Sequence, residues 1–238
     1  MTPVTGVTPV LEAVGLSRTF PSPAGPVHAV VDAALTVHAG ELVAVRGRSG
    51  SGKTTLLNLV GGLDEPTAGR VLVEGTDLAT LDQAAHLALR RERMAFVFQS
   101  FGLVAELTAR ENVEIPLRLL KIPAAERAER VAAALEAVGL TSHAAHTPGQ
   151  LSGGQQQRVG VARAIVAGPV ALLADEPTGQ LDSATGLEIM ALLQDLVHGR
   201  GMAALVATHD PLLLSHADRV LEMHDGRLRE VAPASAQA

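Results

Sequence analysis

The stretch GRSGSGKT, residues 47–54, fits the pattern G-x-x-x-x-G-K-[ST] of a phosphate-binding loop at each fixed position. Before it, the apolar run ELVAVR at 41–46 predicts a buried strand, and after it KTTLLNLV at 53–60 predicts a helix that ends at Gly61 and Gly62. In this context glycine amides can turn toward an anion, and the helix N-terminus adds a favourable dipole. The stretch therefore predicts an α/β fold that binds a phosphorylated ligand.

Two side chains of this stretch carry the expected chemistry. Lys53 is expected to reach the β- and γ-phosphates of a nucleotide, and Thr54 to offer its hydroxyl to Mg²⁺, a hard cation that prefers oxygen ligands. A chance glycine-rich turn is the alternative, and the strand and helix on either side argue against it. The remaining candidates for contact with the nucleotide here are Gly47, Ser49, Gly50, Ser51, Gly52 and Thr55.

The composition describes a globular chain that can bury a large core. Of its 238 residues, 47% are apolar and 18% are charged, which fits one large domain or a core with subdomains. Aromatic residues make up only 2%, and the net charge of −6 comes without a long basic run, so no nucleic-acid partner is expected. The chain has no cysteine, which excludes disulfides and thiolate chemistry and is compatible with a reducing cytoplasm.

Neither end of the chain has the pattern of a targeting signal. Residues 1–9 lack a charged segment followed by an apolar one, and both they and residues 232–238 are expected to be flexible. The longest apolar stretch, 160–174, is interrupted by an arginine, a glycine and a proline, and is too broken for a membrane-spanning helix. We therefore expect a chain that is soluble by itself.

The first hundred residues predict a small antiparallel sheet and then one strand of a buried sheet. Gln99 follows the last of these strands, and ligands gather at the carboxyl ends of strands in an α/β sheet; a solvated loop glutamine is the alternative. Phe20 is either a core residue or a ring on which an adenine stacks. The predicted elements of this part are strands at 10–16, 27–37, 70–74 and 94–98 and a helix at 81–93.

The middle of the chain changes to a helical pattern. In LSGGQQQR, residues 151–158, Ser152 and Gln155 form the pattern of a capping box at the start of a helix. Gly153 and Gly154 occupy the first turn, where each glycine weakens a helix by about 1 kcal/mol relative to alanine. This cost is explained if the backbone must approach a ligand such as a phosphate, and a plain capped helix is the alternative.

Two further strands end in polar side chains that suit catalysis. VALLA at 170–174 reads as a buried parallel strand, after which Asp175 fits a partner of Mg²⁺ and Glu176 a base or orienter for an attacking water. A buried strand at 203–207 brings His209 to the same edge of the sheet. A lone histidine is more often structural, but its place at this edge favours a functional role.

The remaining patterns are structural. His143 and His146 lie three residues apart, but no third ligand is evident, so a metal site is not expected there. A helix is predicted at 183–198, and residues 219–231 predict a hairpin around the turn at 225–226.

Taken in order, the chain carries GRSGSGKT, Gln99, LSGGQQQR, VALLADEP, LD at 181–182 and THD at 208–210. As a set, these motifs resemble the nucleotide-binding subunit of an ABC transporter over residues 10–231. LSGGQ is the discriminating motif, since many P-loop enzymes share the first one. The spacing of DEPTGQLD and the run FVFQSFGLVAELTARENVEIPL further resemble the subgroup of lipoprotein-releasing, macrolide-exporting, peptide-resistance and cell-division ATPases.

The resemblance implies a single ATPase domain at 10–231. Its P-loop NTPase core would hold a mostly parallel sheet, with a small antiparallel β subdomain and an α-helical subdomain at about residues 100–168. The implied activity is ATP hydrolysis, with ATP and Mg²⁺ as cofactors.

The resemblance also implies a dimer, of two identical or pseudo-symmetric subunits, that closes head to tail on ATP. Each ATP would lie between the phosphate-binding loop of one subunit and Ser152–Gln155 of the other, with Asp182 in the loop that links the two sites. Residues that match catalytic roles are Lys53, Gln99, Glu176 and His209; those that match Mg²⁺ ligands are Thr54, Gln99 and Asp175; those that match further nucleotide contacts are Phe20, Val27, Gly153 and Gly154.

The implied partners are separately encoded integral membrane permease subunits. The helical region after Gln99, with Phe101 and Leu103 as exposed candidates, resembles the surface on which they dock. The ATPase would then be cytoplasmic and peripheral on the inner face of the cell membrane. The alternative is a soluble ABC ATPase of translation or DNA repair, but those relatives usually carry two tandem ATPase domains or long coiled-coil insertions, and this chain has one set of motifs and no heptad run.

Two residues depart from the family pattern. Arg48 stands where proline is commoner, and Gln180 stands where asparagine is usual in this subgroup. Neither replaces a catalytic group, so the departures leave the cargo and the subgroup open rather than the hydrolysis of ATP.

Overall fold

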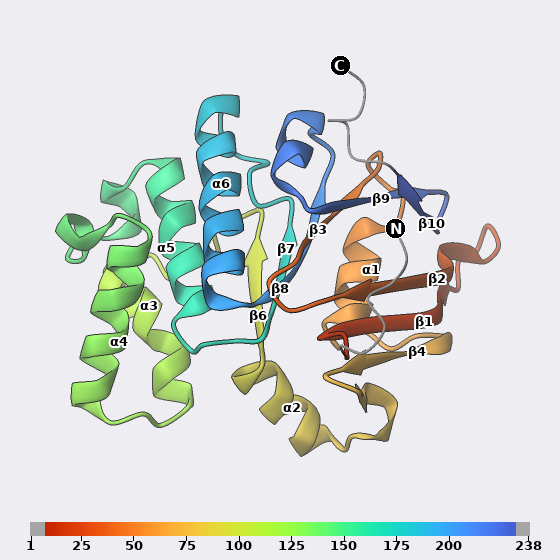
Figure 1. Ribbon diagram of the computed structural model, residues 1–238, viewed down its shortest axis with the longest axis horizontal. Helices are drawn as coiled ribbons and strands as arrows, with labels where there is room; N and C mark the ends of the chain where they lie inside the picture. The colour runs from red at the N-terminus through yellow and green to blue at the C-terminus, as the bar shows by residue number, and fades with distance from the viewer. Residues whose placement is uncertain (1–7, 232–238) are drawn as a thin grey trace.

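The computed structural model describes residues 8–231, which form two β-sheets with helices packed around them (Figure 1). Of the two ends predicted to be flexible, residues 1–7 and 232–238 lie outside the described residues. The strands are β1 (Leu11–Phe20), β2 (Val27–Val37), β3 (Leu42–Arg46), β4 (Ala68–Val73), β5 (Thr76–Asp77), β6 (Met94–Phe98), β7 (Ala171–Asp175), β8 (Ala203–Thr208), β9 (Arg219–His224) and β10 (Arg227–Val231). The helices are α1 (Lys53–Val60), α2 (Gln83–Glu92), α3 (Ala109–Leu119), α4 (Ala124–Ala137), α5 (Gly153–Ile165) and α6 (Ser183–Arg200), with short 3₁₀ turns η1 (Leu78–Thr80), η2 (Thr141–His143), η3 (Pro148–Gln150) and η4 (Pro211–His216).

The larger sheet has the strand order β10-β9-β3-β8-β7-β6, and only β10 runs antiparallel to its neighbour. Strands β3, β7 and β8 consist mainly of valine, leucine and alanine, and nearly all of their side chains are buried. Strands of this composition need apolar cover on both faces of the sheet, which helices supply. The predicted mostly parallel core sheet is confirmed.

Helix α1 lies between the larger sheet and the smaller one (Figure 1). Its buried leucines and valine belong to one hydrophobic cluster with residues of β1, β2 and β4 and of the adjacent face of the larger sheet. This cluster fixes the start of α1, and with it the phosphate-binding loop, against two sheets at once.

The smaller sheet has the order β2-β1-β4-β5 and is antiparallel throughout, as predicted. The strand predicted at 10–16 extends to Phe20 because β1 remains paired with β2 as far as the pair Phe20 and Val27. Cross-strand hydrogen bonds, rather than local alternation of apolar and polar residues, set this boundary.

Helices α3, α4 and α5 occupy the region that the sequence predicts to be helical, beside the β6 edge of the larger sheet (Figure 1). Their buried faces form a second hydrophobic cluster with α6 and with side chains of β6, β7 and β8, including Val113, Leu135 and Ile165. Within residues 8–231, no helix is both long enough and apolar enough to cross a membrane.

The expectation that Phe101 and Leu103 are exposed is wrong, since both side chains are partly buried. Leu103 packs against the second hydrophobic cluster, and the Phe101 ring lies against the start of α5, where its Cζ is 3.6 Å from a Cβ built on Gly153. The large apolar side chains that are exposed near this region are Phe98, Val104 and Leu119.

A fully buried asparagine ties the segment after β6 to α3. The Oδ1 of Asn112 accepts a hydrogen bond from the Val104 amide at 2.8 Å, and its Nδ2 lies 3.1 Å from the Val104 carbonyl oxygen and 3.0 Å from that of Leu107. A buried polar side chain of this kind is stabilising because each of its polar atoms finds a hydrogen-bond partner.

We expect Asn112→Ala to lower the free energy of unfolding by about 3 kcal/mol, because it removes the hydrogen bonds of a fully buried side chain to the Val104 amide and to the Val104 and Leu107 carbonyl oxygens. Urea unfolding followed by circular dichroism measures this change. The exposed neighbour Arg110→Ala is the control, with an expected change within about 0.5 kcal/mol. Equal stability of the two variants would contradict the role assigned to Asn112.

Candidate nucleotide-binding site

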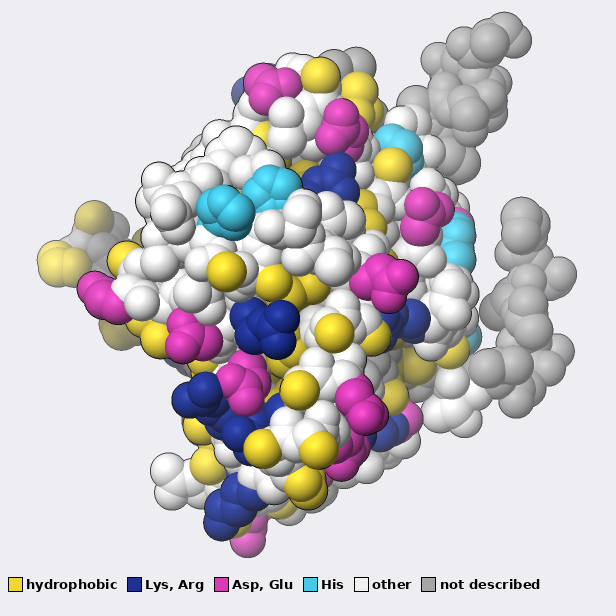
Figure 2. Space-filling view, turned by 90° about the vertical axis from the view of Figure 1, so that its left-hand side faces the viewer, with side chains coloured by type: hydrophobic (Ala, Val, Ile, Leu, Met, Phe, Trp, Pro, Cys, Tyr) yellow, Lys and Arg dark blue, Asp and Glu magenta, His cyan; other side chains and the backbone are white. Residues whose placement is uncertain are grey.

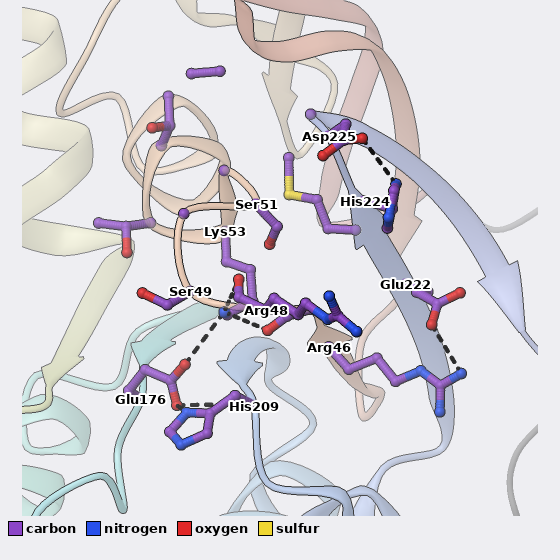
Figure 3. Close-up of a pocket in the computed structure, with 18 of the residues that line it drawn as sticks. Arg46, Arg48, Ser49, Ser51, Lys53, Glu176, His209, Glu222, His224 and Asp225 are labelled. Atoms are coloured by element: carbon purple, nitrogen blue, oxygen red, sulfur yellow. Dashed lines mark hydrogen bonds and ion pairs between the residues drawn. The ribbon is translucent and has the colours of Figure 1, made fainter.

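A cleft of about 1360 Å³ opens at the carboxyl edge of the larger sheet, next to the phosphate-binding loop (Figure 3). It brings together segments from both ends of the chain: the start of β2, the loop between β3 and α1, the ends of β6, β7 and β8, and the turn between β9 and β10. Predicted site residues that line the cleft are Val27, Gly47, Ser49, Gly50, Ser51, Gly52, Lys53, Thr54, Thr55, Gln99, Glu176 and His209.

The backbone conformation of the phosphate-binding loop requires glycine at position 52. Gly52 has a φ of 107°, and a Cβ there would lie 2.1 Å from the carbonyl oxygen of Ala29 in β2. The turn between β9 and β10 also holds the loop, because the Gly226 amide donates to the Ser51 carbonyl oxygen at 3.1 Å. The loop is thus fixed in shape before any ligand arrives.

Lys53 is buried at the base of this loop, with only 7% of its side chain exposed. Its Nζ donates to the carbonyl oxygens of Gly47 at 2.8 Å and Arg48 at 3.2 Å, and lies 3.4 Å from Oε1 of Glu176. These contacts hold a compact ammonium group inside the curve of the loop (Figure 3), where a bound phosphate would meet it.

Glu176 connects Lys53 to His209 (Figure 3). The second carboxylate oxygen of Glu176 accepts a hydrogen bond from Nδ1–H of His209 at 2.8 Å and from the His209 amide at 3.3 Å. Glu176 itself has a φ of 47°, a left-handed conformation that is uncommon outside glycine and that aims the side chain from the end of β7 into the cleft. The geometry therefore joins an ammonium, a carboxylate and an imidazole at the mouth of the loop.

The residues predicted as Mg²⁺ partners supply hard oxygen donors in the same place. Burial raises the pKa of the Asp175 carboxyl, a hydrogen bond from Thr54 opposes that rise, and the neighbouring Glu176 charge adds to it. The Oδ1 of Asp175 is buried and makes no hydrogen bond to another described residue. An unpartnered buried carboxylate oxygen on a residue bonded to the Thr54 hydroxyl fits a divalent cation, and Gln99 directly follows Phe98, the β6 residue paired with Asp175.

Other described residues do not offer a competing metal site. Between residues 8 and 231, no group of three or more His, Cys, Asp or Glu side chains is placed to hold a metal ion. The rings of His143 and His146 lie side by side, with centroids 5.2 Å apart.

The signature segment Ser152–Gln155 does not line the cleft. It begins α5, and the predicted capping box is confirmed: the Ser152 Oγ accepts from the Gln155 amide at 3.2 Å, and the Gln155 Oε1 accepts from the Ser152 amide at 2.9 Å. A Cβ on Gly154 would lie 2.5 Å from Cγ2 of Thr185 at the start of α6. Close packing of α5 against α6 thus also requires glycine here, apart from any contact with a ligand.

Asp182 and Phe20 also lie outside the lining of the cleft. Asp182 caps α6, and hydrogen bonds from the backbone amide and the hydroxyl of Thr185 lower the pKa of its carboxyl. The Phe20 ring is partly buried, and the guanidinium of Arg18 lies over it, 4.6 Å from the ring centroid. Val27, its partner in β2, does reach the cleft.

Several residues that line the cleft have no signal in the sequence. Arg46, just before the phosphate-binding loop, forms an ion pair with Glu222 of β9 at 3.1 Å (Figure 3). Glu222 also pairs with Arg229 of β10. His28 and His224 also line the cleft. Partners such as Arg46 and Glu222 lie more than a hundred residues apart in the chain, so no local pattern could have found them.

A family profile described as ABC transporter matches residues 30–179 of the chain. The macrolide export ATP-binding/permease protein MacB of Salmonella typhimurium is 46% identical over 228 residues, which are 96% of this chain and 35% of that protein. The MacB protein of Rhodospirillum rubrum is 46% identical over 222 residues, 93% of this chain and 34% of its own length. The chain therefore spans about a third of the length of these relatives.

Solved structures of similar fold are cassettes of the same kind. The dimeric structure of MJ0796, described as a bacterial ABC transporter cassette, superposes with a TM-score of 0.84 and 40% identity over 93% of this chain and 97% of its own. A dimeric MJ0796 in a post-hydrolysis state, bound to ADP and Pi, gives a TM-score of 0.83 and 39% identity over the same shares of the two chains. CbiO1 from Clostridium perfringens gives a TM-score of 0.86 and 28% identity over 96% of this chain and 90% of its own.

We expect Gly52→Ala to weaken the binding of a fluorescent ATP analogue by more than about tenfold, because the new Cβ collides with the Ala29 carbonyl and distorts the phosphate-binding loop. The matched control is Gly199→Ala in α6, where a Cβ meets nothing within 4 Å. Unchanged affinity in the Gly52 variant would show that the loop does not bind the phosphates.

Proposed function

The chain belongs to the ABC transporter family and is an ATPase cassette of that family, and on this premise we propose that it drives integral membrane permease subunits by closing as a dimer on ATP. The cassette would work at the inner face of the cell membrane, held there by its permease. The observation that carries this proposal is the arrangement of Lys53, Glu176 and His209 at the mouth of the phosphate-binding loop.

In the proposed reaction, Lys53 neutralises the β- and γ-phosphates once they displace its contacts with the loop carbonyls. Glu176 orients and deprotonates the attacking water, since its carboxylate lines the cleft 3.4 Å from Lys53 Nζ. His209 donates its Nδ1–H to Glu176 and so keeps that carboxylate in place, with its other ring nitrogen free to meet the γ-phosphate.

Thr54, Asp175 and Gln99 are the proposed holders of Mg²⁺, because they combine a hydroxyl, a buried unpartnered carboxylate oxygen and an amide oxygen at one edge of the sheet. When bound, the ion would neutralise charge on the phosphate oxygens. Through the ion, these three residues would orient the phosphates in the loop.

The position of the signature segment supports a dimer in which each site is shared. Ser152–Gln155 and Asp182 lie outside the cleft that holds the phosphate-binding loop of their own chain. A second copy, turned head to tail, would place its signature segment over the open side of the cleft and complete the site. The dimeric MJ0796 structures, one of them with ADP and Pi, are consistent with such an assembly.

Phe20 and Val27 are proposed to hold the adenine. Val27 lines the cleft and is half-exposed, and Phe20 is its cross-strand neighbour. For Phe20 to stack on a base, the Arg18 guanidinium must leave the face of the ring that it now covers, or the base must use the other face.

A shallow groove of about 460 Å³ between α2, β6, α3 and α5 is the proposed docking surface for the permease. Its lining is mainly apolar, and Leu87 and Leu119 at its rim are 56% and 62% exposed. The adjoining helical face mixes hydrophobic side chains with charges of both signs (Figure 2), so the groove fits an amphipathic segment of a membrane protein rather than a polyanion. This groove replaces Phe101 and Leu103 as the expected contact, since those side chains are partly buried.

We expect Glu176→Gln to lower the rate of ATP hydrolysis by about 100-fold or more while leaving the binding of ATP intact, because it removes the base but keeps the shape of the side chain. Steady-state phosphate release measures the rate. Analytical ultracentrifugation should then find a stable dimer with ATP, since closure is no longer followed by hydrolysis. Rapid hydrolysis by this variant would remove Glu176 from its assigned role.

We expect Leu119→Glu to abolish co-purification of the tagged protein with a polytopic membrane protein from gently solubilised native membranes, because it places a charge in the apolar groove. Hydrolysis by the isolated cassette should stay within about twofold of the parent, since the side chain is exposed. The control is Val14→Glu, which replaces an exposed apolar side chain of β1 that does not line the groove. Recovery of the parent with ribosomes or nucleic acid and no membrane protein would contradict the proposed function.

A further inference from the structure

A histidine outside the cleft contacts the signature segment. His143 ends η2, and its Nε2 lies 3.1 Å from Nε2 of Gln155, the last residue of the capping box that starts α5. The family resemblance assigns His143 no role. In the sequence it stands out only as a candidate metal ligand beside His146, and within residues 8–231 no group of three His, Cys, Asp or Glu side chains is placed to hold a metal ion.

The hydrogen-bond network fixes the chemical form of this contact. The Oε1 of Gln155 is already the acceptor for the Ser152 amide, so the Gln155 atom that faces His143 is the NH₂ donor. Nε2 of His143 must therefore be the acceptor, which requires a neutral ring with its proton on Nδ1. Nδ1 lies 3.1 Å from Oγ of Ser142, which accepts that proton's hydrogen bond.

The segment that carries His143 is itself tied to α3. The carbonyl oxygen of Ala144 accepts from the Arg110 amide at 3.0 Å, and that of His146 accepts from the Ala109 amide at 2.8 Å. The ring of His146 packs beside that of His143. Thus His143 links the first turn of α5 to the first turn of α3, two helices that also pack on each other through the hydrophobic cluster.

The start of α5 is a place where such support matters. Gly153 and Gly154 follow Ser152, and two glycines in a first turn leave the helix start with little intrinsic preference for its conformation. The capping box holds this turn through the Gln155 side chain, which is only partly buried and otherwise open to competition from water. His143 Nε2 accepts from the NH₂ group of the same Gln155 side chain whose oxygen holds the Ser152 amide, and so fixes the orientation of that side chain.

We propose that His143 is a positioning residue for the signature segment: by accepting a hydrogen bond from the Gln155 amide, it keeps Ser152–Gln155 in the conformation that contacts the nucleotide held by a second copy of the chain. The inference rests on the proposed ATP-driven dimer. It predicts a defect in closure of the dimer and none in the binding of nucleotide to the monomer, because His143 does not line the cleft of its own chain.

The test compares His143→Leu, which removes the acceptor, with His143→Gln, whose amide oxygen can replace it, both in the Glu176→Gln background. Sedimentation over a series of ATP concentrations measures dimer formation, and a fluorescent ATP analogue measures binding to the monomer. We expect His143→Leu to need about three- to tenfold more ATP for half-maximal dimer, as one lost hydrogen bond implies, and His143→Gln to stay close to the parent. Monomer affinity should be the same in all three.

The matched control is His216→Leu, which removes another histidine–glutamine contact, between Nδ1 of His216 in η4 and Oε1 of Gln194 in α6 at 3.1 Å. It should leave dimer formation unchanged. If the leucine variant of His143 does not fold, Ser142→Ala serves in its place: loss of the Nδ1 partner should weaken dimer formation by about twofold.

Four outcomes overturn the inference. The first is normal dimer formation by His143→Leu, or by Ser142→Ala where that variant has to replace it, and the second is equal impairment of His143→Leu and His143→Gln. The third is a fall in monomer affinity for nucleotide as large as the loss of dimer formation, and the fourth is a defect of the same size in His216→Leu. If the Glu176→Gln parent itself forms no dimer with ATP, the proposed function fails first and the inference falls with it. That result is distinguishable because it precedes any change at His143.

Discussion

Backbone pairing between three buried parallel strands, β3, β8 and β7, is the constraint on which the rest of the structure depends. In their registers Arg46 lies opposite Thr208 and Asp175 opposite Ala207, so the phosphate-binding loop, His209 and Glu176 leave the sheet at one level. The side chains of these strands are almost wholly buried, and apolar cover on both faces of the sheet holds the strands in place. Hydrophobic burial therefore sets the distances on which phosphate chemistry relies, although the buried apolar side chains take no part in it.

The phosphate-binding loop depends on a second set of contacts, from segments near both ends of the chain. Gly52 lies against the Ala29 carbonyl of β2, and a Cβ on Gly47 would lie 2.4 Å from the Met223 carbonyl oxygen of β9. The glycines thus serve two purposes: they leave the amides open to an anion, and they let neighbouring backbones approach closely. A loop held in this way is organised before a ligand binds, which reduces the entropy that binding must overcome.

Within one chain, the charged residues of the cleft and the signature segment Ser152–Gln155 are separate parts of the structure. Lys53, Glu176 and His209 form a connected set, whereas the signature segment is built separately, with Gly154 packed on Thr185 and Gln155 bonded to His143. Each of these two parts is held by its own ion pairs and hydrogen bonds. In the proposed dimer, a nucleotide would act by changing how these two parts meet.

The sequence by itself determined everything that depends on local pattern. Apolar runs located the buried strands, the glycine spacing located the phosphate-binding loop, and Ser152 with Gln155 located the start of α5, since each rests on interactions between residues near in the chain. Only the tertiary structure decided the burial of Phe101, the ion pair of Arg46 with Glu222, and the bond between His143 and Gln155. These contacts join residues that the periodicity of helices and strands does not relate, because they arise when separate elements pack together.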